Sequence, residues 1–158
     1  MDTKQPEGRQ GRQGYQGRLL GLDIGGRRIG VAISDELGLI ASPVAMVPRG
    51  PNVARELRSL VAKYGAVRLV AGLPVSMSGR EGPQAADVRE YTDAIATEVG
   101  LPLDYWDERL TTSIAERSLI AGGTRRDKRK LQVDAVAAAV ILQSYLDHQR
   151  WSSGKQRR

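Results

Sequence analysis

Two aspartates interrupt the most apolar segments of the chain, and their carboxylates are the first candidates for chemistry. Asp23 lies within the run LLGLDIGG, on a strand face that it would share with Leu19 and Gly21. Asp134 lies within VDAVAAAVILQ, one helical turn before Ala138, on the side that would face the core. An unpaired buried carboxylate is costly, so a carboxylate in such a setting normally has a cation, a metal ion or strong hydrogen-bond donors beside it.

A simpler interpretation stays open for each aspartate. Asp23 could accept hydrogen bonds from the backbone of Gly25 and Gly26 in the turn that follows it. Asp134 could cap the N-terminus of a helix that begins at this residue. In either case the carboxylate would have a purely structural role.

The composition excludes several other kinds of site. The chain has 158 residues, no cysteine and a single histidine, His148. Disulfides, thiol nucleophiles and cysteine zinc sites are therefore excluded, and so are a Ser-His-Asp triad and a multi-histidine metal site. No apolar run approaches the roughly 20 residues of a membrane span, and no signal peptide is recognisable, so we expect a cytoplasmic protein. The net charge of +6 suggests an anionic partner, although a solvated basic surface would give the same value.

The segment around Asp23 predicts a β-hairpin. Residues 19–34 contain two short apolar runs joined by a glycine pair, which is typical of two antiparallel strands. Residues 37–47 form a third apolar segment, in which Pro43 indicates an edge position or a strand end. The simplest arrangement is a three-stranded antiparallel meander. Residues 1–17, which contain no Val, Ile, Leu or Phe, are interpreted as a flexible, mildly basic tail.

The rest of the chain alternates between helical and extended patterns. Helical spacing of apolar residues predicts the helices, which glycines close, and short buried runs predict the strands. The folded domain is expected over residues 18–149, with a basic tail over 150–158. The predicted elements are helices over 53–64, 84–99, from Thr111 or Thr112 to about 122, and from about 131 to 149, with strands over 66–73 and 103–107.

This order predicts an α/β protein in which an antiparallel meander is followed by parallel crossover units. The expected fold is ribonuclease-H-like, with a five-stranded mixed sheet, about four flanking helices, and carboxylates on the first strand, at the end of the fifth strand and on the last helix. At this point the sequence resembles the YqgF family, also called the RuvX family of Holliday junction resolvases. The matching motifs are GLDIGGRRIGVAISD over 21–35, VAGLPVSMSGREG over 70–82, DERLTT over 107–112 and VDAVAAAVILQSYLD over 133–147.

The resemblance implies a metal-dependent endonuclease. The family is associated with maturation of the 5′ end of 16S rRNA and with resolution of four-way DNA junctions. It implies that Asp23 and Asp134 are catalytic and bind metal, together with a middle carboxylate. Glu108 is favoured for that position, and Asp107 is the alternative, because successive strand residues point to opposite faces. Carboxylates about 4 Å apart repel by roughly 4 kcal/mol at an effective dielectric near 20, so the cluster requires cations or protons. Oxygen ligands favour Mg2+ or Mn2+.

Basic and glycine-containing segments near these motifs are expected to bind the nucleic acid. Arg27 and Arg28 match the family's basic pair after the glycine turn, and the run RRDKRK over 125–130 would guide a phosphate backbone. Solvated arginines are the alternative interpretation in each case. The expected substrate-binding residues are Arg27, Arg28, Ser76, Gly79, Arg109, Arg125, Arg126, Lys128, Arg129 and Lys130.

Two other classes of function compete with a nuclease. A phosphotransferase would need an adenosine pocket and normally a second domain, which 158 residues cannot hold. A non-catalytic RNA-binding or ribosome-binding protein would keep the basic run without needing the carboxylates. A homodimer would suit the two-fold symmetry of a four-way junction.

Overall fold

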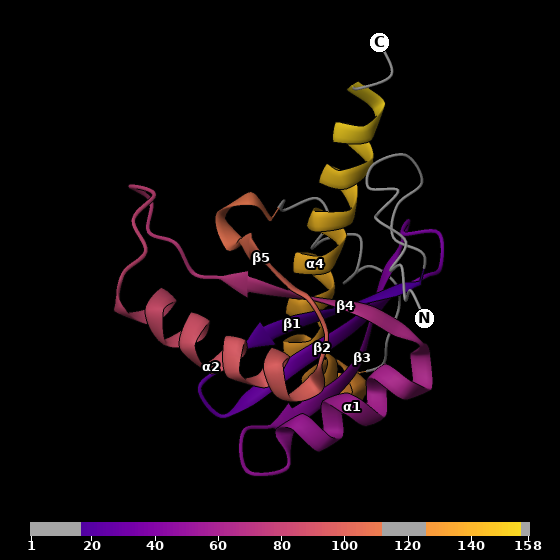
Figure 1. Cartoon of the computed structure of the whole chain (residues 1–158), viewed down its shortest axis with the longest axis vertical. Helices are drawn as coiled ribbons and strands as arrows, with labels where there is room; N and C mark the ends of the chain where they lie inside the picture. Colours follow the sequence, from indigo (N-terminus) through magenta and orange to yellow (C-terminus); the bar gives the residue numbers. More distant parts are fainter. Residues whose placement is uncertain (1–16, 112–125, 156–158) are drawn as a thin grey trace, which may run out of the picture.

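The computed structural model describes residues 17–111 and 126–155, and within the last helix it describes the side chains of residues 135–151. These residues form one mixed β-sheet with helices packed on its two faces (Figure 1). The strands lie in the order β3-β2-β1-β4-β5. Their bounds are Arg18–Ile24 for β1, Arg28–Ser34 for β2, Ala41–Pro48 for β3, Ala66–Leu73 for β4 and Leu103–Asp107 for β5.

The pairing of the strands confirms the predicted ribonuclease-H-like sheet. β1 pairs with β2, and β2 with β3, in antiparallel fashion, while β4 joins β1 and β5 joins β4 in parallel. β3 is an edge strand, as Pro43 indicated. Because β1, β4 and β5 are parallel, their carboxyl ends lie at one edge of the sheet, where Leu73 of β4 pairs with Asp107 of β5.

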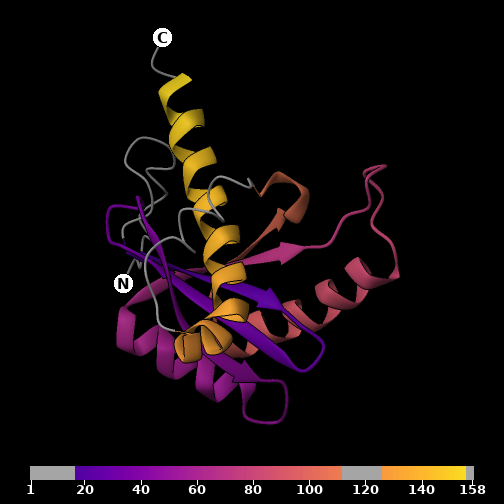
Figure 2. The same ribbon diagram turned by 180° about the vertical axis from the view of Figure 1, so that it is seen from behind.

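The helices divide between the two faces of the sheet. Figures 1 and 2 show α1 (Val53–Tyr64) and α2 (Pro83–Val99) on one face and α4 (Arg126–Lys155) crossing the other. Alternate residues of β1 follow this division: Leu20 packs in the core that contains Leu57 of α1, and Leu19 packs with Leu142 of α4. The predicted alternation along the first strand is therefore confirmed, with the face of Asp23 turned toward α4.

The last helix is longer than predicted at both ends. It spans Arg126–Lys155 instead of residues 131–149, because Lys, Arg and Gln are strong helix formers and no proline or glycine interrupts residues 126–131. The predicted helix that ends near residue 122 lies outside the described residues, as do residues 1–16 of the predicted tail over 1–17. Among the helices that the structure describes, none is long and apolar enough to span a membrane.

Candidate active site

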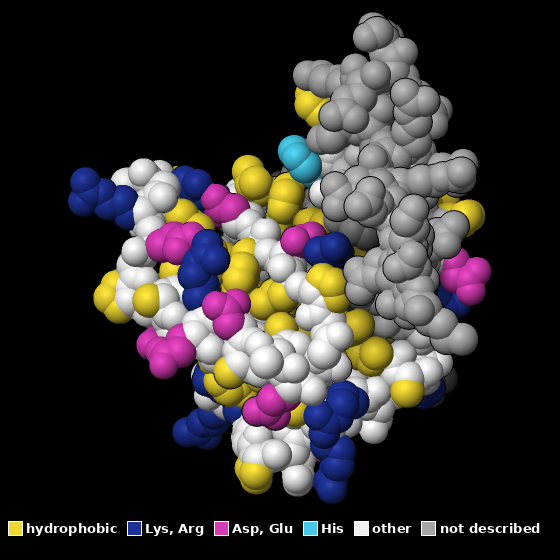
Figure 3. Space-filling model, in the orientation of Figure 1, with side chains coloured by type: hydrophobic (Ala, Val, Ile, Leu, Met, Phe, Trp, Pro, Cys, Tyr) yellow, Lys and Arg dark blue, Asp and Glu magenta, His cyan; other side chains and the backbone are white. Residues whose placement is uncertain are grey.

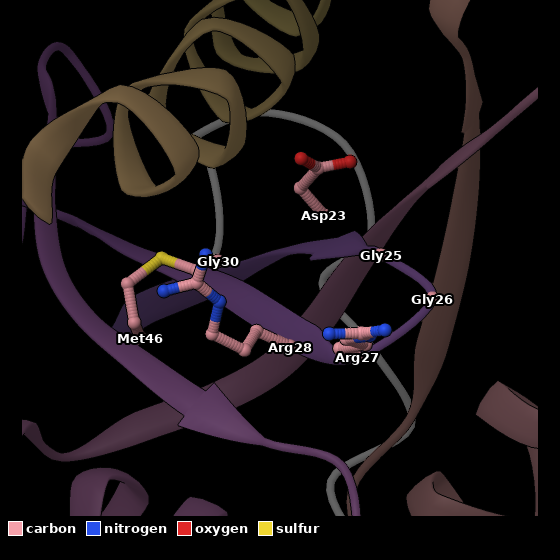
Figure 4. Close-up of a pocket in the computed structure, with 7 residues that line it drawn as sticks. All are labelled: Asp23, Gly25, Gly26, Arg27, Arg28, Gly30 and Met46. Atoms are coloured by element: carbon pink, nitrogen blue, oxygen red, sulfur yellow. The ribbon is translucent and has the colours of Figure 1, made fainter. Parts of the chain in front are cut away.

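Asp23 lies near the carboxyl end of β1, just before the turn that leads into β2 (Figure 4). Its side chain is half-buried, and Figure 4 shows the carboxylate pointing toward the side of the sheet that α4 covers. The turn is closed by its own backbone, because the Gly25 amide donates to the Arg28 carbonyl at 3.0 Å. Asp23 therefore presents carboxylate oxygens between the sheet edge and α4.

A pocket opens beside Asp23 at this edge of the sheet. The side chains of Arg27 and Arg28 are exposed and come from the turn and the start of β2. The structure thus brings together one expected catalytic residue and the expected basic pair, as Figure 4 shows. The lining residues are Asp23, Gly25, Gly26, Arg27, Arg28, Gly30 and Met46.

Glu108 lies in a single 3-10 turn (η1, Glu108–Leu110) directly after β5. Its side chain passes over Gly72 of β4, where a Cβ atom would lie 2.8 Å from Glu108 Oε1. Burial raises the pKa of Glu108 above its usual range, and the negative charges of Asp23 and Asp107 raise it further. Glu108 and Asp23 thus reach the same face of the sheet and repel each other electrostatically.

Asp107 has a different environment from its neighbour. Its carboxylate accepts hydrogen bonds from the Arg109 guanidinium at 2.6 and 3.0 Å, and from the Arg109 backbone amide at 2.9 Å. These bonds hold the pKa of Asp107 below its usual value. Asp107 therefore caps η1 and pairs with Arg109, which was expected to bind the substrate.

Asp134 lies within α4, and its side chain is outside the described part of the structure. Among the described side chains, no group of three Asp, Glu, His or Cys residues converges as a metal site does. Asp23 and Glu108 supply two carboxylates with unfavourable mutual charge, and this all-oxygen donor set suits a hard cation such as Mg2+ or Mn2+. The described residues therefore fit part of the implied metal site.

The β1 glycine that precedes Asp23 on the same face lets α4 approach the sheet closely. A Cβ atom at Gly21 would lie 2.8 Å from Leu142 Cβ and 3.2 Å from the Ala138 carbonyl oxygen. Sequence reasoning assigned Gly21 no role, although its place between Leu19 and Asp23 on one strand face was a usable signal. The contact sets the position of the helix that carries Asp134.

Gly21→Ala is expected to lower the free energy of unfolding by about 1–3 kcal/mol, because the Leu142 Cβ and the Ala138 carbonyl are fixed to the helix and α4 must shift. Urea unfolding monitored by circular dichroism measures the effect. Gly50→Ala is the control, since a Cβ atom at Gly50 would meet nothing within 4 Å. Equal unfolding midpoints for the two variants would contradict the close approach.

Arg49 is a second residue that sequence reasoning missed. Its guanidinium donates to the Gly25 carbonyl at 3.0 Å and lies over the Tyr91 ring, 3.8 Å from the centroid. Its backbone amide also donates to the Arg27 carbonyl at 2.9 Å. Arg49 therefore ties the β1–β2 turn to the end of β3 and to α2. No sequence pattern indicated this, because the three segments meet only in the fold.

The other expected substrate-binding residues fall in two places. Ser76 and Gly79 lie in the exposed loop between β4 and α2, and a Cβ atom at Gly79 would lie 3.9 Å from Arg109 Nη1. Arg125 lies outside the described residues. The other basic residues of the run lie inside α4, which begins at Arg126, so the prediction that the last helix begins only at about residue 131, after the run, is wrong. These residues are Arg126, Lys128, Arg129 and Lys130, and their side chains are not described.

Glu108→Gln is expected to stabilise the metal-free protein at neutral pH. Because the folded-state pKa is raised, the contribution of Glu108 to stability is fully present below its unfolded pKa of about 4.3 and is lost as the pH rises through the folded pKa. Gln cannot ionise, so the variant should be the more stable form at pH 7 and should lose that advantage near pH 4. Urea unfolding in EDTA at both pH values tests this, with Glu90→Gln on the exposed side of α2 as the charge-matched control. A Glu108→Gln variant less stable than wild type at pH 7 would contradict it.

Comparison with known proteins gives a consistent family. The RuvX model, described as Holliday junction resolvase, matches residues 17–148. A protein of Heliobacterium modesticaldum named "Putative pre-16S rRNA nuclease" is 46% identical over 132 residues, covering 82% of this chain and 89% of the relative. A protein of Geobacillus kaustophilus with the same name is 44% identical over 137 residues, covering 84% of this chain and 99% of the relative.

Solved structures share the fold at low sequence identity. RuvC of Thermus thermophilus in complex with a Holliday junction substrate superposes with a TM-score of 0.57 at 11% identity, covering 86% of this chain and 96% of RuvC. The fowlpox virus Holliday junction resolvase gives a TM-score of 0.51 at 11% identity, covering 83% and 98%. Because the family model and the curated relatives span nearly the whole described domain, this chain belongs to the RuvX family.

Proposed function

We propose that this protein is a metal-dependent endonuclease that hydrolyses phosphodiester bonds in structured nucleic acid. The observation that carries the proposal is the convergence of Asp23 and Glu108, from β1 and from the turn after β5, on one face of the sheet. Two carboxylates whose charges oppose each other are unfavourable for the metal-free fold, which is expected of a site built for a bound cation. Membership of the RuvX family supports the same reaction.

The residues at this edge of the sheet would have different roles in such a reaction. Asp23 and Glu108 would hold Mg2+ or Mn2+, with Asp134 as the third carboxylate. When bound, such cations activate a water and neutralise charge on the leaving oxygen. Arg27 and Arg28 would bind phosphate oxygens from the exposed side of the pocket, because guanidinium groups form paired hydrogen bonds with phosphates. Arg49 would keep these two arginines in place by holding their turn.

The position of Asp134 in α4 agrees with a role as third carboxylate. Residues four and seven positions apart share one face of a helix. Asp134 is four residues before Ala138 and seven before Ile141, and these two residues pack against Gly21 and Gly72 on the face of Asp23 and Glu108. This spacing along the sequence is what supports the proposal of Asp134 as the third carboxylate.

The substrate that we favour is the 5′ end of precursor 16S rRNA, because the curated relatives carry that name. A Holliday junction is the alternative, which the family description supports. A non-catalytic RNA-binding protein would have no need of the convergent carboxylates. A homodimer is expected if the substrate is a two-fold junction, and sedimentation of the protein with and without a junction tests this.

A single cleavage experiment separates these possibilities. One preparation is offered a precursor 16S rRNA and a four-way DNA junction, with Mg2+ or Mn2+ present and then removed by EDTA. Cleavage of the rRNA that requires metal supports the favoured proposal, and cleavage of the junction supports the alternative. Binding of RNA with no cleavage of either substrate would favour the non-catalytic function.

Replacing Arg125, Arg126, Lys128 and Arg129 by Gln is expected to weaken binding but to preserve cleavage at saturating substrate. Each lost phosphate contact should reduce the slope of log affinity against log salt by about 0.9 on duplex DNA and about 0.7 on single strands. Filter binding over a range of salt measures this, with Arg55→Gln on the exposed side of α1 as control. An unchanged slope with a large fall in the saturated rate would instead assign these residues to the reaction itself.

A further inference from the structure

The loop between β4 and α2 projects from the body of the protein and carries a methionine that is almost fully exposed. Met77 is 92% exposed. Figure 1 shows this segment extending away from the sheet at the left, and Figure 3, in the same orientation, shows Lys or Arg side chains on the projection. Single exposed apolar residues are ordinary on protein surfaces, so exposure alone identifies no site. The turn that displays Met77 and the place of the loop beside the candidate active site are the further observations.

Packing at the base and hydrogen bonds at the tip shape the loop. At its base, Val75 packs against the cluster of Leu73, Ala85 and Val88. At its tip, the Gly79 amide donates to the Ser76 carbonyl at 2.9 Å, and the Ser76 hydroxyl donates to the Arg80 carbonyl at 2.9 Å. These bonds close a tight turn with Met77 at its corner. A side chain displayed on a preformed turn loses little backbone freedom when it binds.

The projection also stands beside the candidate active site. It follows β4, which lies between β1 and β5, and Leu73 at its base pairs with Asp107. The tip lies near Arg109, because a Cβ atom at Gly79 would be 3.9 Å from its Nη1. Arg80 on the same loop is exposed. Met77 is therefore an exposed apolar side chain on the loop that carries Arg80, at the edge of the sheet where Asp23 and Glu108 lie.

We propose that Met77 inserts between bases of the bound nucleic acid, next to the bond that is cleaved. Basic side chains contact the phosphate backbone, whereas an uncharged thioether gains nothing there and gains most against the faces of bases. Methionine is among the side chains that proteins insert as wedges into base steps. The inference rests on the proposed nuclease function and narrows its substrate class to nucleic acid with an unpaired or easily opened base step near the cleavage position.

Fluorescence of 2-aminopurine tests the proposal directly. The probes are a four-way DNA junction labelled at the branch, an RNA hairpin with a single-stranded 5′ extension labelled at the boundary, and continuous DNA and RNA duplexes of equal length. Binding is measured in EDTA with wild type, Met77→Ala and Met77→Leu. Leu37→Ala is the matched control, because Leu37 is 79% exposed and lies in the hairpin between β2 and β3, at the opposite edge of the sheet.

Wild type and Met77→Leu are expected to change the fluorescence of at least one interrupted probe, the DNA junction or the RNA hairpin. Met77→Ala should lose that change and bind this probe about tenfold more weakly, with unchanged affinity for the continuous duplex and an unchanged salt slope. Leu37→Ala should behave as wild type. The inference would be overturned if Met77→Ala kept wild-type affinity and fluorescence. It would also be overturned if Met77→Ala and Leu37→Ala lost affinity equally, or if Met77→Ala lost affinity equally for interrupted and continuous probes.

The result is separable from the proposed nuclease function. If wild type cleaves with metal and Asp23→Asn does not, but Met77→Ala binds as wild type does, the inference about Met77 fails alone. If no metal-dependent cleavage occurs although Met77→Ala loses the fluorescence change, the nuclease proposal fails and base insertion stands.

Discussion

Asp23→Asn is expected to reduce cleavage by about 10^3-fold or more at saturating metal and substrate, while the fold is retained. The carboxylate is one of two that lie on the same face of the sheet. Loss of a cation ligand removes several kcal/mol of transition-state stabilisation, at about 1.4 kcal/mol for each factor of ten. The metal-free variant should melt at a higher temperature than wild type, because the repulsion between Asp23 and Glu108 is gone. The same results are expected for Asp134→Asn.

Single-turnover cleavage and thermal melting with and without Mg2+ or Mn2+ measure these effects. By linkage, the rise in melting temperature that metal causes in wild type should shrink in the variant. Asp35→Asn is the control: it removes one carboxylate at the opposite end of β2, where an Asn carbonyl can still accept from the Leu39 and Ile40 amides. Full activity of Asp23→Asn, or an unchanged metal-induced shift, would refute a shared cation site.

Glu108→Gln should reduce the cleavage rate by a factor similar to that of Asp23→Asn, whereas Asp107→Asn should change the rate only severalfold. Glu108 lies over Gly72 and responds to the charge of Asp23, while Asp107 is bound to Arg109. Breaking a partly exposed ion pair of that kind costs about 0.2–1 kcal/mol. The two substitutions remove the same charge from adjacent residues, so each controls for the other.

The decisive measurements are the saturated cleavage rates of the two variants and a crystal structure with Mn2+. A larger loss for Asp107→Asn than for Glu108→Gln would reverse our assignment. So would a crystal in which the metal contacts Asp107 and leaves Glu108 with solvent or Arg109. Equal, severe losses in both variants would indicate that the Asp107–Arg109 pair is needed to hold the η1 turn in place.

Local sequence patterns determined most of the fold. Period-two alternation placed Leu19 and Leu20 on opposite faces of β1, because successive side chains of a strand must point to opposite sides. Glycines fixed the ends of α1 and α2, since Gly65 and Gly100 adopt positive φ values of 69° and 81° that other residues rarely take. Both kinds of signal depend on backbone geometry within a few residues, so the sequence alone contains them.

The tertiary structure decided how the neighbouring acids differ. From the sequence, Asp107 and Glu108 were two successive strand residues, and alternation allowed either one to face Asp23. In the fold, β5 ends at Asp107 and the chain turns into η1. There the Arg109 guanidinium binds the Asp107 carboxylate, and the Glu108 side chain passes over Gly72. The outcome depends on where a strand ends and on the space that a glycine leaves on the adjacent strand.

The same limit applies to Arg49 and Gly21. Arg49, just after β3, donates a hydrogen bond to the Gly25 carbonyl in the β1–β2 turn. Gly21 packs against Ala138 and Leu142 of α4, which lie more than a hundred residues further along the chain. Neither role can be read from local composition, because its partner is close in space and distant in sequence. The residue types of the candidate site were thus available from the sequence, but which of them meet was decided by strand order, by the close approach of α4 and by the point at which β5 ends.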